Sequence, residues 1–320
     1  MSILSRDFLG DLVRRSVALA LFAGVIASGA GPGRSAAMPL ATNRAGGDDA
    51  STANVAATAL APVPGAAVGG AHPPRPAPVA APPERMLLMG DSVALSLAPS
   101  LVDASRAHGV SLHNGAVSGC SLIEGVTSSP DGRNFPWSVG CASGIARYEQ
   151  DMISQYQPDV VVWMSAWETA NRTLDDGSLV FPGTRRGNLR LLGEIDKAAG
   201  RLRAGGARLV MVLLAPVPQG FEQALEHTAL NRLSCLNAML EDYARRYSDS
   251  VSVVYMSEFL CPNGAPCPAE VAGTIPRPDG VHFDDPAGAR WAAEQLFPRL
   301  IAPQLPGDAP VWGYVGVGQA

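Results

Sequence analysis

Apolar, strand-like runs alternate with helical patterns along most of this chain, starting at residues 86–89. Four more candidate strands follow at 110–113, 160–164, 209–214 and 251–255. Strands that are apolar throughout are typical of a parallel sheet that helices cover on both faces. The pattern therefore predicts an α/β domain built on a five-stranded parallel sheet.

Helical patterns separate these runs and also follow the last one. They are predicted at 93–107, 144–155, 188–204, 221–247 and 286–300. In sheets whose parallel strands are connected in this way, ligands bind at the carboxyl ends of the strands. We therefore expect functional side chains to lie directly after strands.

The composition divides the chain into four regions. Residues 1–36 carry arginines ahead of an uncharged, largely apolar stretch, which is typical of a signal peptide; an N-terminal anchor is the alternative interpretation. Residues 37–83 are rich in Ala, Pro and Gly and contain no aromatic residue, so they predict a disordered linker. The folded domain is expected at 84–304 and a short Gly-rich tail at 305–320.

The net charge and the predicted signal peptide limit which partners and locations are expected for this protein. The formal net charge is −5 at pH 7 and no Lys/Arg-rich run occurs, so nucleic acid is not an expected partner. The leader predicts a secreted, periplasmic or cell-envelope protein, which the N-terminal segment could tether to a membrane.

The five cysteines fit an oxidising compartment. Cys120 and Cys141 bracket one loop, and Cys261 and Cys267 bracket a shorter one, so two local disulfides are predicted. Cys235 lies in a helical pattern and is expected to be the free thiol. Zinc is the weaker alternative, because the C-x5-C spacing matches none of the usual ligand patterns. No metal or organic cofactor is expected.

Two short sequence motifs contain the candidate catalytic residues. Gly90-Asp91-Ser92 follows the first strand at a strand-to-helix turn, and Asp279-x-x-His282 precedes the last helix. Among the histidines, His282 is the one with a carboxylate three residues earlier in a loop. Ser92 as nucleophile, His282 as base and Asp279 as the group that orients the base would together perform acyl transfer. A helix-capping role in a Pro/Gly turn is the alternative interpretation of Asp279.

Acyl transfer also needs hydrogen-bond donors for the developing oxyanion. The backbone N–H of Ser92, near the start of a helix, is one natural donor. Gly119, in the segment after the second strand, could bring a second backbone N–H to the substrate. A simple turn glycine is the alternative interpretation of Gly119.

Together these residues resemble the SGNH/GDSL hydrolases, which have Gly-Asp-Ser, Ser-Gly and Asp-x-x-His at the same places. The resemblance covers residues 85–300. It implies carboxyl-ester chemistry on a flavodoxin-like three-layer α/β/α sandwich with a parallel five-stranded sheet. It also implies that Ser92 is the nucleophile, that Asp279 and His282 complete the triad, and that Gly119 donates to the oxyanion.

One block departs from the family pattern. After the third strand the family usually has Gly-x-Asn-Asp, whose Asn donates to the oxyanion, whereas this chain has Ser165-Ala166-Trp167-Glu168. Trp167 stands where the Asn is expected, so its indole N–H is a candidate third donor; a core aromatic at the sheet end is the alternative. The variant, with Asn171-Arg172 following, is similar to SGNH domains associated with bacterial envelope O-acyltransferases.

These observations predict an exported serine esterase that acts on an O-acylated glycan or another envelope-associated ester. An O-acyltransferase with the same triad is the first alternative, and a non-catalytic glycan-binding module on a degenerate SGNH fold is the second. Phe135, Pro136 and Trp137 lie between Cys120 and Cys141, and they could form a sugar-binding rim or a small cluster under a loop.

Overall fold

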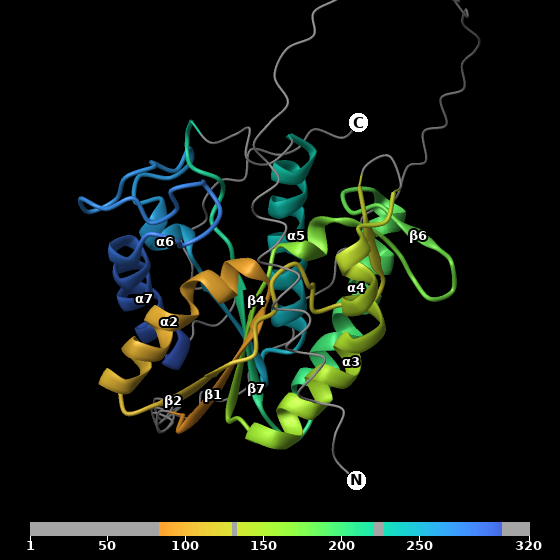
Figure 1. The fold of residues 1–320 in the computed structure, drawn as a ribbon, viewed down its shortest axis with the longest axis horizontal. Helices are drawn as coiled ribbons and strands as arrows, with labels where there is room; N and C mark the ends of the chain where they lie inside the picture. The colour runs from red at the N-terminus through yellow and green to blue at the C-terminus, as the bar shows by residue number, and fades with distance from the viewer. Residues whose placement is uncertain (1–82, 130–132, 221–226, 303–320) are drawn as a thin grey trace, which may run out of the picture. The chain divides into compact units, whose positions relative to one another are not determined.

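The computed structural model describes residues 83–129, 133–220 and 227–302, whose ribbon is drawn in colour in Figure 1. The predicted leader and tail lie outside the described residues. So do nearly all of the predicted linker and the start of the helix expected from residue 221. Within the described ranges, no helix combines the length and the apolar character that crossing a membrane requires.

Five parallel strands form the central sheet, in the order β2-β1-β4-β7-β8. Their bounds are β1 Arg85–Gly90, β2 Ser111–Asn114, β4 Val160–Met164, β7 Arg208–Leu213 and β8 Val251–Tyr255. The predicted strands are confirmed to within one residue at each end. Because β2 and β4 lie on opposite sides of β1, the order reverses there, and this is where such sheets bind ligands.

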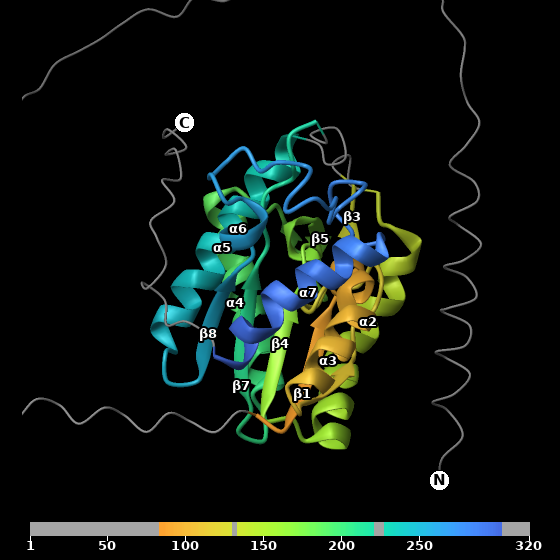
Figure 2. The same ribbon diagram turned by 90° about the vertical axis from the view of Figure 1, so that its left-hand side faces the viewer.

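Helices cover both faces of the sheet and produce three layers, as Figures 1 and 2 show. The helices are α2 Ser92–Ala107, α3 Pro136–Tyr156, α4 Arg185–Leu202, α5 His227–Arg246, α6 Ser257–Leu260 and α7 Pro286–Ile301. Side chains of α2, α6 and α7 pack with Leu88 and Val162 on one face. Side chains of α3, α4 and α5 pack with Leu87 and Val161 on the other. Both faces of the central strands are therefore buried, which is why β1, β4 and β7 are largely apolar, whereas the edge strand β2 is not. The α/β/α prediction is confirmed.

Helix α3 begins eight residues before the predicted start at residue 144. Pro136 is its first residue, where the fixed backbone of proline favours helix initiation and its missing N–H costs no hydrogen bond. Cys141 consequently lies inside a helix. The predicted bridge between Cys120 and Cys141 is present, and its second cysteine lies on this helix.

A second, antiparallel sheet was not predicted. It consists of β3 Val126–Ser128, β5 Asn171–Thr173 and β6 Leu179–Val180, in the order β3-β5-β6. Its strands have two or three residues, too few to show a hydrophobic period. The pairing of β3 with β5 links the segment after β2 to the segment after β4, next to the carboxyl ends of both strands.

Candidate active site

The turn between β1 and α2 presents Ser92. A side chain at Gly90 would place its Cβ 1.9 Å from the carbonyl oxygen of Met164 on β4, so glycine is required there. Asp91 caps α2, and its Oδ1 accepts a hydrogen bond of 2.8 Å from the N–H of Val93. Ser92 is the first residue of the helix and lies half-buried at the carboxyl end of β1.

A hydrogen-bonded relay joins Ser92 to His282, which lies 190 positions away in the sequence, and through it to Asp279. Nε2 of His282 is 2.8 Å from Oγ of Ser92, and Nδ1 of His282 is 2.6 Å from Oδ2 of Asp279. The structure therefore brings together the serine, the histidine and the aspartate that the sequence analysis singled out. His108 and His113 instead contact the rings of Phe297 and Tyr156.

The environment of Asp279 keeps its carboxylate ionised. Partial burial by itself would raise the pKa of Asp279, but hydrogen bonds from the side chain and backbone of His282 and from the N–H of Val281 outweigh it and lower the pKa. Oδ1 accepts the two backbone N–H groups at 2.7 and 2.8 Å, and this leaves Oδ2 for the imidazole. An ionised Asp279 can orient His282 and stabilise its protonated form.

The helix-capping interpretation of Asp279 is not what the structure shows. Asp285 caps α7 instead, and its Oδ2 accepts the N–H of Gly288 at 2.7 Å. Between the two acids, the buried Phe283 anchors the loop, and its N–H donates to Oγ of Ser96 on α2 at 3.0 Å. The segment that carries His282 is thus fixed to the same helix that begins with Ser92.

Gly119 lies in the loop that follows β2. Its φ of +74° is in the left-handed region that favours glycine. The loop is tied to the turn before Ser92, because the N–H of Val117 donates to the carbonyl of Gly90 at 2.9 Å. As the first residue of α2, Ser92 itself has a backbone N–H outside the intrahelical hydrogen bonds. The roles of Ser92 and Gly119 as backbone oxyanion donors remain predictions.

Trp167 follows β4, which is the neighbour of β1 in the sheet. Its side chain is half-buried, so it is not a fully enclosed core residue. Its ring meets the ring of Phe135 edge-on, with centroids 6.0 Å apart. Its backbone N–H donates to Oδ2 of Asp91 at 3.0 Å, and this bond fixes Trp167 beside the turn that carries Ser92. The side chain of Trp137 lies outside the described part of the chain.

We expect the substitution Trp167→Phe to lower kcat for ester hydrolysis by about a hundredfold, with little change in melting temperature. The change removes the indole N–H while keeping most of the ring, and losing one oxyanion donor typically costs about 10²- to 10³-fold in kcat. The measurement is kcat beside the melting temperature. A loss of less than about threefold with a lowered melting temperature would instead make Trp167 a packing residue.

Sequence reasoning gave no role to three charged residues behind the site. Asp91, Glu168 and Arg172 have no exposed surface. Burial raises the pKa of Asp91, although four hydrogen-bond donors counteract it, and burial also raises the pKa of Glu168. Burial lowers the pKa of Arg172 to about 10, so the guanidinium stays charged at neutral pH. The available signal was that charged residues directly follow two buried strands.

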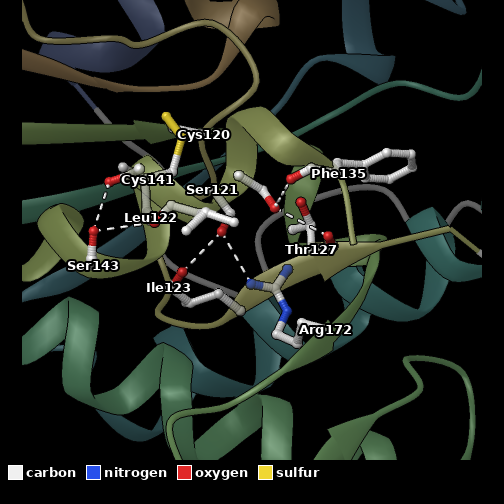
Figure 3. The surroundings of a disulfide bond; sticks show 12 residues. Cys120, Ser121, Leu122, Ile123, Thr127, Phe135, Cys141, Ser143 and Arg172 are labelled. Carbon is white, nitrogen blue, oxygen red and sulfur yellow. Dashed lines mark hydrogen bonds between the residues drawn. A yellow bond between two sulfur atoms is a disulfide. The ribbon is translucent and has the colours of Figure 1, made fainter. Parts of the chain in front are cut away.

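Two disulfides are present in the described residues. Cys120 and Cys141 are joined with their Cα atoms 5.4 Å apart, and Cys261 and Cys267 with theirs 4.5 Å apart. Cys235 is unbridged and half-buried. The first bridge connects the residue after Gly119 to α3, as Figure 3 shows. Such disulfides fit a location outside the cytoplasm.

Replacing both Cys120 and Cys141 by serine is expected to lower the free energy of unfolding by about 3 kcal/mol, because the loop of 21 residues is no longer closed in the unfolded chain. Urea unfolding monitored by circular dichroism measures the change. Cys235→Ser is the matched control and should leave the free energy of unfolding within about 0.5 kcal/mol of wild type. An equal loss in the control would contradict the role of the bridge.

One group of described residues could offer ligands to a metal ion. Side-chain atoms of Asp279, His282 and Asp284 lie within 4.8 Å of one another. However, Nδ1 of His282 is bound to Asp279 and Nε2 to Ser92, so a metal ligated by this histidine would displace the relay. The geometry thus fits a proton relay better than a metal centre.

Comparison with known proteins identifies the family. The family described as SGNH domain (fused to AT3 domains) matches residues 65–297. Among curated proteins no match is found.

Solved structures are similar to this chain at low sequence identity. A GDSL-like lipase from Bacteroides thetaiotaomicron is 14% identical, with 68% of this chain and 88% of that chain covered and a TM-score of 0.44. The periplasmic domain of a lipopolysaccharide acetyltransferase from Salmonella ser. Paratyphi A is 13% identical, with 68% and 84% covered and a TM-score of 0.44. The C-terminal catalytic domain of peptidoglycan O-acetyltransferase A from Streptococcus pneumoniae is 14% identical, with 68% and 92% covered and a TM-score of 0.37.

The family match spans most of the chain and includes every residue of the relay. The resemblance seen in the sequence is thereby confirmed. The chain belongs to the family of SGNH domains (fused to AT3 domains).

Proposed function

We propose that this chain is an exported serine esterase that hydrolyses an O-acylated glycan or another envelope-associated ester. The observation that carries the proposal is the relay of hydrogen bonds from Asp279 through His282 to Ser92, with distances of 2.6 and 2.8 Å. Nucleophile, base and orienting carboxylate within hydrogen-bond reach are the features by which acyl-transfer sites are recognised on unrelated folds.

Ser92 attacks the ester carbonyl carbon while its proton passes to Nε2 of His282. The resulting oxyanion receives hydrogen bonds from the backbone N–H groups of Ser92 and Gly119 and from the indole of Trp167. The bond to the alcohol breaks as His282 gives its proton to the leaving oxygen. Water then attacks the acyl carbon and passes a proton to His282. The bond between the acyl carbon and Oγ of Ser92 breaks, His282 returns the proton to Oγ, and the acid is released.

An apolar pocket borders the relay and is suited to the acyl group. It is lined by Val93, the residue after Ser92, and by Val281, the residue before His282. Ala166, Leu214 and Met256 are among the residues that complete it. The lining also includes Arg277, whose guanidinium donates to the carbonyls of Ala215 and Pro216. The apolar side chains favour burial of an alkyl group.

The location outside the cytoplasm is part of the proposal. The two disulfides support it, since such bonds persist in oxidising compartments. Residues 1–36 would serve as the signal peptide or as an N-terminal membrane tether, and residues 37–83 as the linker to the domain.

An O-acyltransferase that uses the same triad is the second candidate. The family description supports it, because the matching domains are fused to AT3 domains. In that reaction a sugar hydroxyl, not water, takes the acyl group from Ser92. Adding acceptor sugars to the assay separates the two reactions, because a transferase forms more acylated sugar than free acid.

The test is reaction with a fluorophosphonate probe, followed by turnover of p-nitrophenyl acetate and acetylated polysaccharides. We expect stoichiometric labelling that peptide mass mapping places on Ser92, together with release of acetate. Absence of both would favour a non-catalytic glycan-binding module. Labelling on another residue would contradict the assignment of Ser92.

A further inference from the structure

Three segments form the candidate site, and hydrogen bonds made by the buried side chains of Asp91, Glu168 and Arg172 connect them. The segments are the turn at Asp91, the loop from Gly119 to Glu124 and the turn from Ser165 to Glu168. Asp91 joins the first to the third, since its Oδ2 accepts hydrogen bonds of 3.0, 2.7 and 3.0 Å from Oγ of Ser165 and from the N–H groups of the next two residues.

Glu168 and Arg172 join the third segment to the second. Oε1 of Glu168 accepts the N–H of Leu122 at 2.9 Å. Nη1 of Arg172 donates to Oγ of Ser121 at 3.0 Å, and Nη2 donates to the carbonyl of Trp167 at 2.8 Å. Figure 3 shows the guanidinium of Arg172 reaching Ser121 next to the disulfide at Cys120.

Gly119 therefore lies between two anchored parts of its loop. On one side, the N–H of Val117 is bound to the carbonyl of Gly90, directly before the nucleophile turn. On the other side, Cys120 is bridged to α3, and the next two residues are held by the buried charges. Among the described residues, no strand lies between β2 and β3, so no sheet hydrogen bonds hold this loop, and these contacts determine where the N–H of Gly119 lies.

Glu168 and Arg172 are not arranged in the way that would stabilise the fold most. In the described structure, Oε2 of Glu168 and Nε of Arg172 are buried without a hydrogen-bond partner. Burying a charged or polar group is costly unless hydrogen bonds satisfy it, so these two incompletely satisfied side chains are weak evidence for a stabilising role. Their contacts to the Gly119 loop point to a role in placing that loop.

We propose that Glu168 and Arg172 are positioning residues that fix the backbone N–H of Gly119 relative to Ser92. The inference rests on the proposed function, because it assigns that N–H to the developing oxyanion. A donor displaced by about 1 Å loses much of its effect on the transition state. Releasing the loop should therefore lower kcat while leaving substrate binding nearly unchanged.

The experiment compares Glu168→Leu and Arg172→Leu with wild type on p-nitrophenyl acetate. Each is expected to lower kcat by about 10- to 100-fold and to change KM by less than about twofold. Glu168→Gln keeps an oxygen that can accept from Leu122, and it should keep kcat within about threefold of wild type. A Gln variant as impaired as the Leu variant would overturn the proposed contact.

The matched control is Arg203→Leu at the opposite end of the sheet. Arg203 also makes several hydrogen bonds, including 2.8 Å to Oγ of Ser250 and 3.2 Å to the hydroxyl of Tyr243. Its loss should lower the melting temperature and leave kcat unchanged. If the Arg172→Leu variant lowers kcat no more than this control at the same loss of melting temperature, the proposal is wrong.

Two further measurements test the positioning role even where the Leu variants do not fold or the proposed function fails. If the Leu variants do not fold, Ser121→Ala removes a single contact of Arg172 and should still lower kcat at least threefold; an unchanged kcat would overturn the proposal. If wild type shows no Ser92-dependent turnover, the proposed function fails, and amide hydrogen exchange decides the inference. Exchange at residues 119–122 must rise in Glu168→Leu and not in Arg203→Leu.

Discussion

The variant Ser92→Ala is expected to lose about 10⁶-fold in kcat for ester hydrolysis, the size of loss that removal of a triad serine causes in a well-studied serine hydrolase. Without Oγ no acyl-enzyme forms, and His282 has no nucleophile to activate. Titration with a fluorophosphonate probe and kcat on p-nitrophenyl acetate measure the effect. The fold should be intact, because Oγ of Ser92 points to His282 and not into the core.

Ser105→Ala is the matched control for this change. Ser105 lies on the same helix as Ser92 but near its far end, where its hydroxyl donates to the carbonyl of Val102 at 2.8 Å. We expect wild-type kcat in this variant. Retention of more than a tenth of wild-type activity in pure Ser92→Ala protein would refute the assignment of the nucleophile.

The second large effect is expected for Asp279→Asn, which should lower kcat about 10⁴-fold near neutral pH. An asparagine can still accept the N–H groups of Val281 and His282 through its oxygen, so the turn is kept. Its NH₂ group then faces Nδ1, and the histidine must adopt the tautomer that cannot take the proton of Ser92. The measurement is kcat across the pH range.

The control for Asp279→Asn is Asp284→Asn, which removes an exposed carboxylate close to His282 that is not part of the relay. Its kcat should stay within about twofold of wild type, because a surface charge interacts weakly in water. An equal loss in both variants would mean that local charge, and not the hydrogen bond to Nδ1, determines the activity.

Stability supplies an independent readout for Asp279. Its pKa is lowered in the folded protein, so the ionised carboxylate stabilises the fold above the unfolded-state pKa. This contribution disappears as the pH falls through the folded-state pKa. The melting temperature of Asp279→Asn should therefore lie below that of wild type at neutral pH, and the difference should shrink in acid. A difference that grows in acid would contradict the lowered pKa.

The sequence by itself determined the central sheet and the residues of the relay. Strands such as β1 and β4 are buried on both faces, so they appear as continuous apolar runs that stand out without any tertiary information. Ser92 and His282 could be identified because each lies in a short motif whose neighbours define its chemistry. The folded chain brings the two motifs together at the carboxyl end of β1, where Nε2 of His282 lies 2.8 Å from Oγ of Ser92.

Only the tertiary structure decided how the site is supported. The short strands of the second sheet are too brief to show a period, and their pairing joins segments about 45 residues apart. Likewise, the sequence shows that Glu168 and Arg172 follow the buried strand β4, but it does not show which groups they contact. Their partners, Leu122 and Ser121, are 46 and 51 residues away, so their role depends on contacts that exist only once the chain has folded.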